Sequence, residues 1–230
     1  MFLDIMALKG DKESIRKSIY DKLFEENQSL RPSGDYGKIP DFKGRDIAAE
    51  LLAGTEEWKQ SKTIFCSPDS AQIPVRYLAL KDNKNLIMAS PNLEHGYLCL
   101  EGSKLNGHEN EASTKEGAFE YCTRFFDFGE KGASDLGDSL NDDSLERTFD
   151  MAIDMVVEGS VGVDKSGNRI GKGKGFADRE IEDLFNKNLI DENTPLVTTI
   201  HPFQLVDHIP MESHDKKLNM IVSTKEIIRI

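Results

Sequence analysis

The stretch GSVGVDKSGNRIGKGKGFADRE, residues 159–180, decides the fold, because a strand pattern precedes it and a helix pattern overlaps its end. Residues 153–157, IDMVV, are β-branched or apolar except for one aspartate and predict a buried strand. The apolar residues at the far end recur close to helical spacing and predict an amphipathic helix. They are Phe176, Ile181, Leu184, Phe185 and Leu189.

Glycine occupies every second position between this strand and this helix, at Gly171, Gly173 and Gly175. Glycine permits positive φ and lets a ligand approach the backbone closely, so successive amide N–H groups can point into one concavity. The helix that follows adds its own unpaired amides and the positive end of its dipole. The spacing therefore favours a loop that binds an anion.

The charges of the same stretch agree with an anionic ligand. Residues 165–176 contain four basic side chains and no acidic one, although the chain has a net charge of −12. Because a hydrogen bond to a charged group contributes about 1.5–3 kcal/mol, a triphosphate is the natural ligand. The loop has neither the Walker pattern nor the Rossmann pattern. On spacing alone, a flexible loop with solvated lysines is the alternative.

The rest of the chain alternates predicted strands with predicted helices. Strands are expected at 63–66, 85–89, 196–201 and 218–222, and helices at 11–27, at 45–60 and from Val75 onward. This alternation implies a parallel sheet covered on both faces. We therefore predict an α/β fold, a single three-layer α/β/α domain with a mainly parallel sheet over residues 1–230.

The amino-acid composition limits the compartments and partners that we expect for this protein. No run of apolar residues is long enough to span a membrane, and the charged N-terminal stretch is unlike a signal peptide. The three cysteines, Cys66, Cys99 and Cys122, have neither disulfide nor zinc spacing, which favours the reducing cytoplasm. The net negative charge argues against nucleic acid as a partner.

Residues 109–146 form an acidic segment, with 11 acidic and 3 basic residues. We expect a partly mobile surface insertion, with one helix over 116–126. Its carboxylates lack the spacing of a calcium-binding loop, so a solvated face is favoured over a metal site.

Four ordered motifs resemble the 5-formyltetrahydrofolate cyclo-ligase (methenyltetrahydrofolate synthetase) family. GNRIGKGKGFADR at 167–179 is similar to its G-x-R-[LI]-G-x-G-x-G-[YF]-Y-D-R signature. Residues 12–16 resemble its K-x-x-[LI]-R, residues 154–164 its D-[LI]-[VI]-[VI]-x-G-x-A-[FV]-D, and residues 209–224 its closing L-P-x-E-x-H-D motif. The chain looks most like the divergent, cyclo-ligase-like branch of this family.

The resemblance implies an isomerase/CoA-transferase-like topology and an ATP- and Mg²⁺-dependent ligase. The implied reaction closes 5-formyltetrahydrofolate to 5,10-methenyltetrahydrofolate, with charge neutralisation by Arg169, Lys172 and Lys174. Asp178 and Asp215 match the family's Mg²⁺ ligands. The residues expected to contact ATP are Lys12, Arg16, Gly171, Gly173, Gly175, Phe176, Asp178 and Arg179.

Several of these residues also have an alternative interpretation. Lys12 and Arg16 lie one helical turn apart, and without the resemblance they would be interpreted as a solvated basic edge. Asp178 could instead stabilise the first turn of its helix through the dipole. His201 ends a predicted strand, where ligands of α/β sheets bind, but it could equally be a structural histidine.

At two positions the sequence differs from the family residues that contact the folate. The family's folate-contacting glutamate is Gln72 here, and the tyrosine pair before Asp-Arg is Phe176-Ala177. Arg76, which the family motif lacks, is expected either to reach an anionic ligand or to be a surface helix residue. We therefore place Gln72, Arg76 and His201 at the substrate and expect a folate or a related small molecule.

Three functional hypotheses remain open. The first is a cyclo-ligase or a related ATP-dependent ligase, acting as a monomer or homodimer. The second is a nucleotide-binding regulatory module without turnover. The third is an enzyme of the wider isomerase and CoA-transferase-like fold group, which rests on fold analogy alone.

Overall fold

A sheet of eight strands runs through the protein in the computed structural model, which describes residues 2–90, 96–126, 152–212 and 215–230. Its order is β11-β10-β8-β5-β1-β2-β3-β4. The strands are β1 (Thr63–Cys66), β2 (Asn85–Ala89), β3 (Tyr97–Glu101), β4 (Arg124–Phe126), β5 (Met155–Val157), β8 (Leu196–Ile200), β10 (Met220–Ser223) and β11 (Ile227–Arg229). The five inner strands from β10 to β2 pair in parallel, and β11, β3 and β4 pair antiparallel at the edges. The prediction of a mainly parallel α/β sheet is confirmed.

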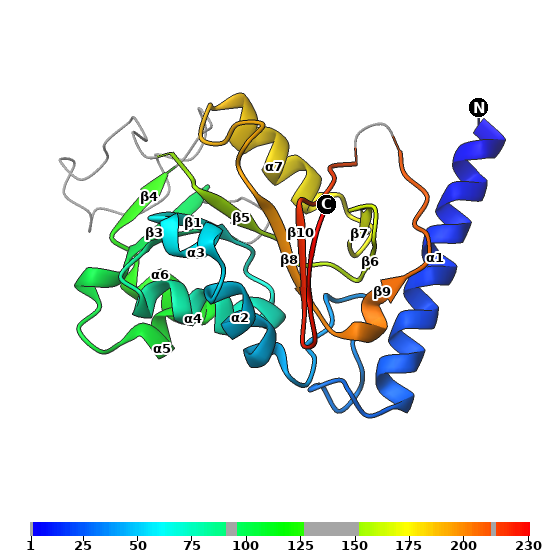
Figure 1. Ribbon diagram of the computed structural model, residues 1–230, viewed down its shortest axis with the longest axis horizontal. Coiled ribbons are helices and arrows are strands. Elements are labelled where there is room, and N and C mark those ends of the chain that lie inside the picture. The colour runs from blue at the N-terminus through cyan, green and yellow to red at the C-terminus, as the bar shows by residue number, and fades with distance from the viewer. Residues whose placement is uncertain (1, 91–95, 127–151, 213–214) are drawn as a thin grey trace.

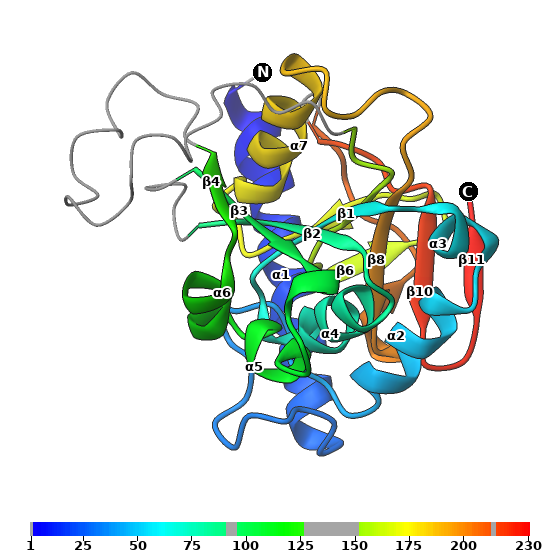
Figure 2. The same ribbon diagram turned by 90° about the vertical axis from the view of Figure 1, so that its left-hand side faces the viewer.

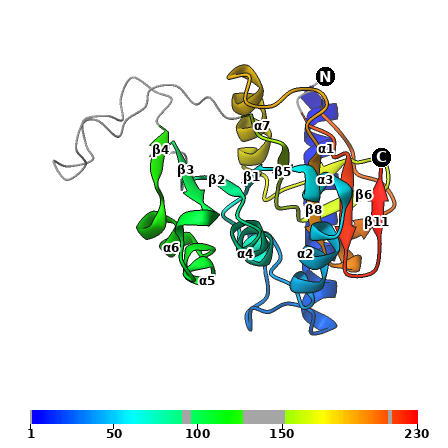
Figure 3. The ribbon, with the colours of Figure 1, turned by 60° about the vertical axis from the view of Figure 1, so that its left-hand side comes forward.

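Helices cover both faces of this sheet (Figures 2 and 3). One face packs on α2 (Arg45–Ala53), α3 (Glu56–Gln60), α4 (Ile73–Lys81), α5 (Glu109–Ala112) and α6 (Lys115–Tyr121), and α7 (Phe176–Asn186) lies on the opposite face. Side chains of successive strand residues point to opposite faces, so Ile64 and Cys66 pack with α2 and α4 while Phe65 packs with α7. This alternation explains why β1 is buried along its whole length.

A second sheet shares the layer of α7. It has three strands in the order β7-β6-β9, with β6 (Gly162–Asp164), β7 (Arg169–Ile170) and β9 (Leu205–Val206). Val163 of β6 packs against Ile200 and Ile221 of the large sheet. Three short 3₁₀ helices complete the described elements: η1 (Ser70–Gln72), η3 (Gly102–Lys104) and η5 (Pro202–Gln204).

The long N-terminal helix α1 (Phe2–Glu25) flanks the second sheet (Figure 1). Its buried stripe, Ile19 and Leu23, packs in one cluster with Val161 and Ile170. The helix expected over 11–27 is therefore present, and its apolar stripe packs on the small sheet and its neighbouring loops. Among the described residues, no helix combines the length and apolar character that a membrane crossing needs.

Two predicted helices differ from the structure. The helix expected over 45–60 is broken, because Gly54 caps α2 and the Thr55 side chain accepts a hydrogen bond from the Trp58 amide to start α3. The helix expected over 116–126 ends at Tyr121, and β4 follows as an antiparallel partner of β3. Of the acidic segment 109–146, residues 127–146 lie outside the described residues.

The parallel strands end at one edge of the large sheet. Ser67, Ser90 and Glu158 directly follow the last residues of β1, β2 and β5. In open α/β sheets a ligand binds beyond the carboxyl ends of the strands. The fold therefore marks this edge as the place to look for a site.

Candidate functional site

A glycine-rich loop, residues 171–175, connects β7 to α7 at this edge. Gly173 and Gly175 have φ of 87° and 64°, left-handed values that side chains other than glycine adopt at a cost. No side chain caps the start of α7. Its first amides are thus left for another acceptor, as an anion site requires.

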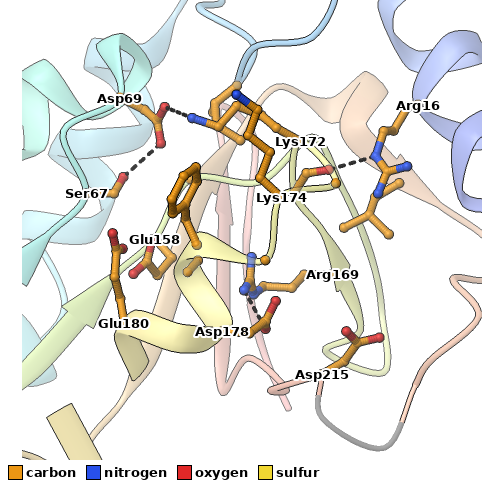
Figure 4. A pocket seen from close by; sticks show the side chains of 18 of the residues that line it. Arg16, Ser67, Asp69, Glu158, Arg169, Lys172, Lys174, Asp178, Glu180 and Asp215 are labelled. Atoms are coloured by element: carbon orange, nitrogen blue, oxygen red, sulfur yellow. Dashed lines mark hydrogen bonds and ion pairs between the residues drawn. The ribbon is translucent and has the colours of Figure 1, made fainter. Parts of the chain in front are cut away.

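The loop forms one wall of a cleft of about 640 Å³, a volume typical of small-ligand sites (Figure 4). The strand ends at Ser67, Ser90 and Glu158 form another wall. Most residues predicted to contact ligand or metal line this cleft. They are Lys12, Arg16, Arg169, Gly171, Lys172, Gly173, Lys174, Gly175, Phe176, Asp178 and Asp215.

Helix α1 contributes two cations to the cleft. The buried Nζ of Lys12 lies 2.7 Å from Asp215 and 3.1 Å from Glu212. The Nε of Arg16 donates to the carbonyl of Gly171 at 2.8 Å, and a Cβ built on Gly173 would lie 3.5 Å from the guanidinium carbon. The expected convergence of α1 and the glycine loop is therefore present, although more than 150 residues separate them.

Arg169 of β7 lies under the glycine loop. Its side chain is buried and donates from one terminal nitrogen to Asp178 at 2.7 Å. Its Nε is also buried and has no acceptor among the described residues. A buried donor without a partner is costly, so a ligand oxygen placed here would be favoured.

The two loop lysines differ in their environment. Lys172 lies 3.0 Å from Asp69, which also accepts a 3.3 Å hydrogen bond from Ser67. Lys174 is exposed and has no ion pair in the described part of the cleft. Lys174 is thus the loop cation that a ligand could reach without displacing a carboxylate.

Asp178 and Asp215 come close together although they belong to different segments. The backbone amide of Lys216, next to Asp215, donates to Asp178 at 3.3 Å. Within the described ranges no cluster of three or more His, Cys, Asp or Glu side chains could hold a metal. Two carboxylates suit Mg²⁺, which takes its remaining ligands from phosphate oxygens and water. Both carboxylates are at present paired with Arg169 and Lys12.

Two buried glutamates, which the sequence did not lead us to expect, also line the cleft. Glu158 and Glu180 are 2% and 7% exposed. Burial raises the pKa of Glu180 to about 7, and it raises the pKa of Glu158 well above its usual value, with the neighbouring Glu180 adding to the effect. The two carboxyl groups are thus hydrogen-bonded to each other and shielded from solvent.

Two residues predicted to contact the substrate lie away from the cleft. Gln72 is fully buried, and its Oε1 accepts a 2.6 Å hydrogen bond from Thr199. Arg76 is 1% exposed and donates to the carbonyls of Ser67 and Asp69 at 2.5 and 3.1 Å. Its interpretation as a surface residue is therefore wrong. Its position supports a structural role, in which it holds the loop after β1.

His201 and Arg179 also lie outside the residues that line the cleft. The Nδ1 of His201 accepts from the Phe203 amide at 3.1 Å and caps η5, and burial lowers the pKa of His201 to about 4. Arg179 donates to the carbonyls of Lys174 and Gly175 at 3.0 and 3.3 Å. These contacts support the structural alternative for His201 and give Arg179 a role in holding the loop.

The sequence contained signals for some of the cleft residues that we did not predict. Glu158 comes directly after a predicted strand and Asp69 three residues after one, the region where α/β sheets place ligand-binding groups. Glu180 follows Phe176 by four residues, so the two share one face of α7. Combining strand ends with helix faces would have identified all three carboxylates.

Comparison with known proteins identifies the protein family of this chain. The model of the 5-formyltetrahydrofolate cyclo-ligase family matches residues 8–224. This chain belongs to the 5-formyltetrahydrofolate cyclo-ligase family.

The curated relatives carry a related name. A "methenyltetrahydrofolate synthase domain-containing protein" from Bos taurus is 30% identical over 220 residues, which cover 94% of this chain and 53% of the relative. The proteins of that name from Mus musculus and Homo sapiens are 30% and 28% identical, over 94% and 96% of this chain and 54% of each relative. The chain thus spans about half the length of these relatives.

Solved structures support the fold. A 5,10-methenyltetrahydrofolate synthetase from Aquifex aeolicus has a TM-score of 0.54 at 18% identity, covering 95% of this chain and 92% of that one. A 5,10-methenyltetrahydrofolate synthetase from Mycoplasma pneumoniae has a TM-score of 0.50 at 14% identity, covering 92% and 98%. At these identities the likeness describes the fold alone.

Proposed function

We propose that this chain is an ATP- and Mg²⁺-dependent ligase that closes 5-formyltetrahydrofolate to 5,10-methenyltetrahydrofolate, or carries out the same chemistry on a related small molecule. The observation that carries the proposal is the meeting of Arg16 and the glycine loop over one cleft, with Arg169 beneath. Membership of the cyclo-ligase family supports the reaction class.

The described residues fit a bound triphosphate. The Nε of Arg169 is a buried donor without an acceptor, the glycines leave room beside Arg16, and the amides at the start of α7 have no side-chain cap. ATP, when bound with Mg²⁺, would supply the phosphoryl group that activates the formyl oxygen, so that this oxygen can leave as inorganic phosphate when the neighbouring nitrogen bonds to the formyl carbon and closes the ring. The protein's task in such a reaction is positioning and charge neutralisation.

Each residue then has a defined task. Arg169, Lys172 and Lys174 neutralise phosphate charge, and the backbone at Gly171, Gly173 and Gly175 binds phosphate oxygens. Asp178 and Asp215 at present pair with Arg169 and Lys12. They would hold Mg²⁺ once the ligand's phosphates bind these two cations in their place. Phe176 would contact the nucleotide, and Arg179 would keep the loop in place.

The test is turnover of 5-formyltetrahydrofolate with ATP and Mg²⁺, followed by the absorbance of the methenyl product. We expect product formation in the wild type and a large loss in Lys172→Ala and Lys174→Ala. Lys165→Ala is the matched control, because Lys165 is exposed and does not line the cleft. Absence of ATP binding would overturn the proposal, and binding of a phosphosugar or CoA without ATP would favour the fold-analogy hypothesis.

The second candidate is a nucleotide-binding module without turnover. It is favoured by the position of Gln72, which is buried away from the cleft, and by Ala177, which lines the cleft where the family has a second tyrosine. ATP binding that is preserved without methenyl product would select this candidate.

The cellular setting is part of the proposal. We propose the reducing cytoplasm, because all three cysteines are free thiols and two of them are buried. We also propose a monomer or homodimer that acts on a small molecule, not on nucleic acid or membranes. Size-exclusion chromatography with light scattering decides between monomer and dimer.

A further inference from the structure

The floor of the cleft has a pair of carboxyl groups that the proposed phosphate chemistry does not use. Glu158 follows β5, and Glu180 lies on α7 one turn after Phe176. Figure 4 shows both side chains on the opposite side of the cleft from Arg16. The two glutamates therefore face a part of the cleft separate from the α1 end of the glycine loop.

The two carboxyl groups hydrogen-bond to each other, which leaves one oxygen of Glu158 without a partner among the described residues. The Oε1 of Glu158 is buried and accepts no hydrogen bond from any described residue. Of the nearby cations, Lys172 pairs with Asp69 at 3.0 Å, and Arg169 pairs with Asp178 at 2.7 Å through a terminal nitrogen while its Nε has no acceptor among the described residues. A buried acceptor without a donor is costly, so this one is suited to a ligand that brings its own N–H groups.

We propose that Glu158 and Glu180 bind the substrate by accepting hydrogen bonds from two adjacent N–H groups at the edge of a flat heterocycle. The chemical class is a 2-amino-oxopyrimidine edge, whose ring N–H and amino N–H lie side by side. This inference rests on the proposed function, since it names the residues that hold the second substrate beside the phosphate site.

The geometry of α7 supports a flat ligand. Phe176 and Glu180 are four residues apart, so an aromatic ring and a carboxylate lie on one helix face, and both line the cleft. The Arg179 guanidinium lies 4.9 Å from the centre of the Phe176 ring and steadies it. Phe176 would then lie between the two ligands: it would contact the nucleotide and also stack on the flat substrate, whose edge would lie one turn further along the helix, at Glu180.

The two glutamates place acid groups in a cleft to which Gln72 contributes none. The family's folate-contacting glutamate is replaced by Gln72, which is buried against Thr199 and does not line the cleft. Glu158 and Glu180 supply an acid group to the cleft from two other elements. Acidic recognition of the substrate edge is then retained, with its position moved from the loop after β1 to β5 and α7.

Two kinds of natural ligand carry this edge: the pterin of a folate and the base of a guanine nucleotide. The experiment measures binding by isothermal titration calorimetry of 5-formyltetrahydrofolate, GTP and ATP to the wild type, Glu158→Gln and Glu180→Gln. Glu182→Gln is the matched control, because Glu182 is exposed on the same helix and does not line the cleft. Circular dichroism and melting curves confirm that each variant is folded.

We expect one of the two amino-oxo ligands to bind the wild type, and both cleft variants to bind it at least about tenfold more weakly, because the amide replaces a carboxyl oxygen that accepts a hydrogen bond with an N–H that faces the ligand's own N–H. ATP affinity and the Glu182→Gln control should stay within about twofold of the wild type. If Glu158→Gln fails to fold, the inference is tested with Glu180→Gln and with an analogue of the ligand that lacks the 2-amino group. The analogue should bind the wild type at least about tenfold more weakly.

Unchanged affinity in folded Glu180→Gln, or equal affinity for the 2-deamino analogue, would overturn the inference. Failure of the wild type to bind either amino-oxo ligand would overturn it as well. Binding of GTP in place of the folate would support the edge recognition and overturn folate as the substrate. Loss of ATP binding alone, with folate recognition intact, would instead overturn the proposed ligase.

Discussion

The Nζ of Lys12 lies 2.7 Å from a carboxylate oxygen of Asp215, although 203 positions separate the two residues in the sequence. Both side chains are largely shielded from solvent, with 8% and 9% of their surface exposed. The contact joins α1 to the segment before β10, at the edge of the cleft. The packing of α1 against the rest of the protein therefore also completes the candidate site.

Removing the Lys12 cation should destabilise the protein. Lys12→Met removes the cation that pairs with Glu212 and Asp215, and loss of one member of a buried pair costs about 3 kcal/mol. The measurement is the free energy of unfolding in urea. Lys17→Met is the control, since Lys17 forms an exposed pair with Asp21 and such pairs contribute little. Equal stability of the two variants would show that the buried pair does not anchor α1.

Alanine substitutions at two positions of the glycine loop should have different effects, one on the stability of the fold and the other on the affinity for ATP. Gly173 has φ of 87°, so Gly173→Ala should lose about 1 kcal/mol of unfolding free energy. Gly171 does not have positive φ, and the nearest atom to an added Cβ is 3.7 Å away on Arg169. Gly171→Ala should therefore keep its melting temperature but bind ATP more weakly, because Gly171 lines the cleft and an added methyl group leaves less room for a phosphate beside the backbone. Full ATP affinity in Gly171→Ala would contradict close approach of the phosphates at this position.

Asp178→Asn should weaken the dependence of nucleotide binding on Mg²⁺. The amide removes one of the two candidate carboxylate ligands, so the Mg²⁺ concentration for half-maximal ATP binding should rise by at least about tenfold. Titration of Mg²⁺ at fixed ATP measures this. The Glu182→Gln variant carries the same loss of charge on the same helix, outside the cleft. If both variants shift equally, Asp178 acts through net charge and not as a ligand.

His201 should make folding sensitive to acid. Burial lowers the pKa of His201 to about 4, so the folded state binds fewer protons at this site than the unfolded state, whose pKa is near 6.5. Its stabilising effect is present above pH 6.5 and is lost as the pH falls toward 4. Protonation of Nδ1 would also break its hydrogen bond with the Phe203 amide.

The control for this prediction is His201→Asn, because asparagine is also a good N-cap and does not titrate in this range. Melting temperatures between pH 7.5 and 5 should fall less in His201→Asn than in the wild type. Identical pH profiles would show that another group causes the acid sensitivity.

The sequence alone determined the elements whose signals are local. The strands expected at 63–66 and 85–89 have the bounds of β1 and β2, because a short apolar run between turn residues is a signal within one segment. The glycine loop could be recognised in the same way, since alternate glycines and a cluster of cations are properties of adjacent residues. The short strands of the second sheet, only two or three residues long, carry too little pattern to be predicted.

Only the tertiary structure decided what each polar side chain contacts. Gln72 and Arg76 begin the same helical segment, yet one binds Thr199 and the other holds the backbone after β1. Glu158 and Glu180 meet because β5 and α7 pack together, which no local pattern in either segment records. The physical reason is that apolar spacing specifies which face of an element is buried, whereas the partner of a buried charge depends on segments brought together by folding, as Lys12 and Asp215 are across 203 positions.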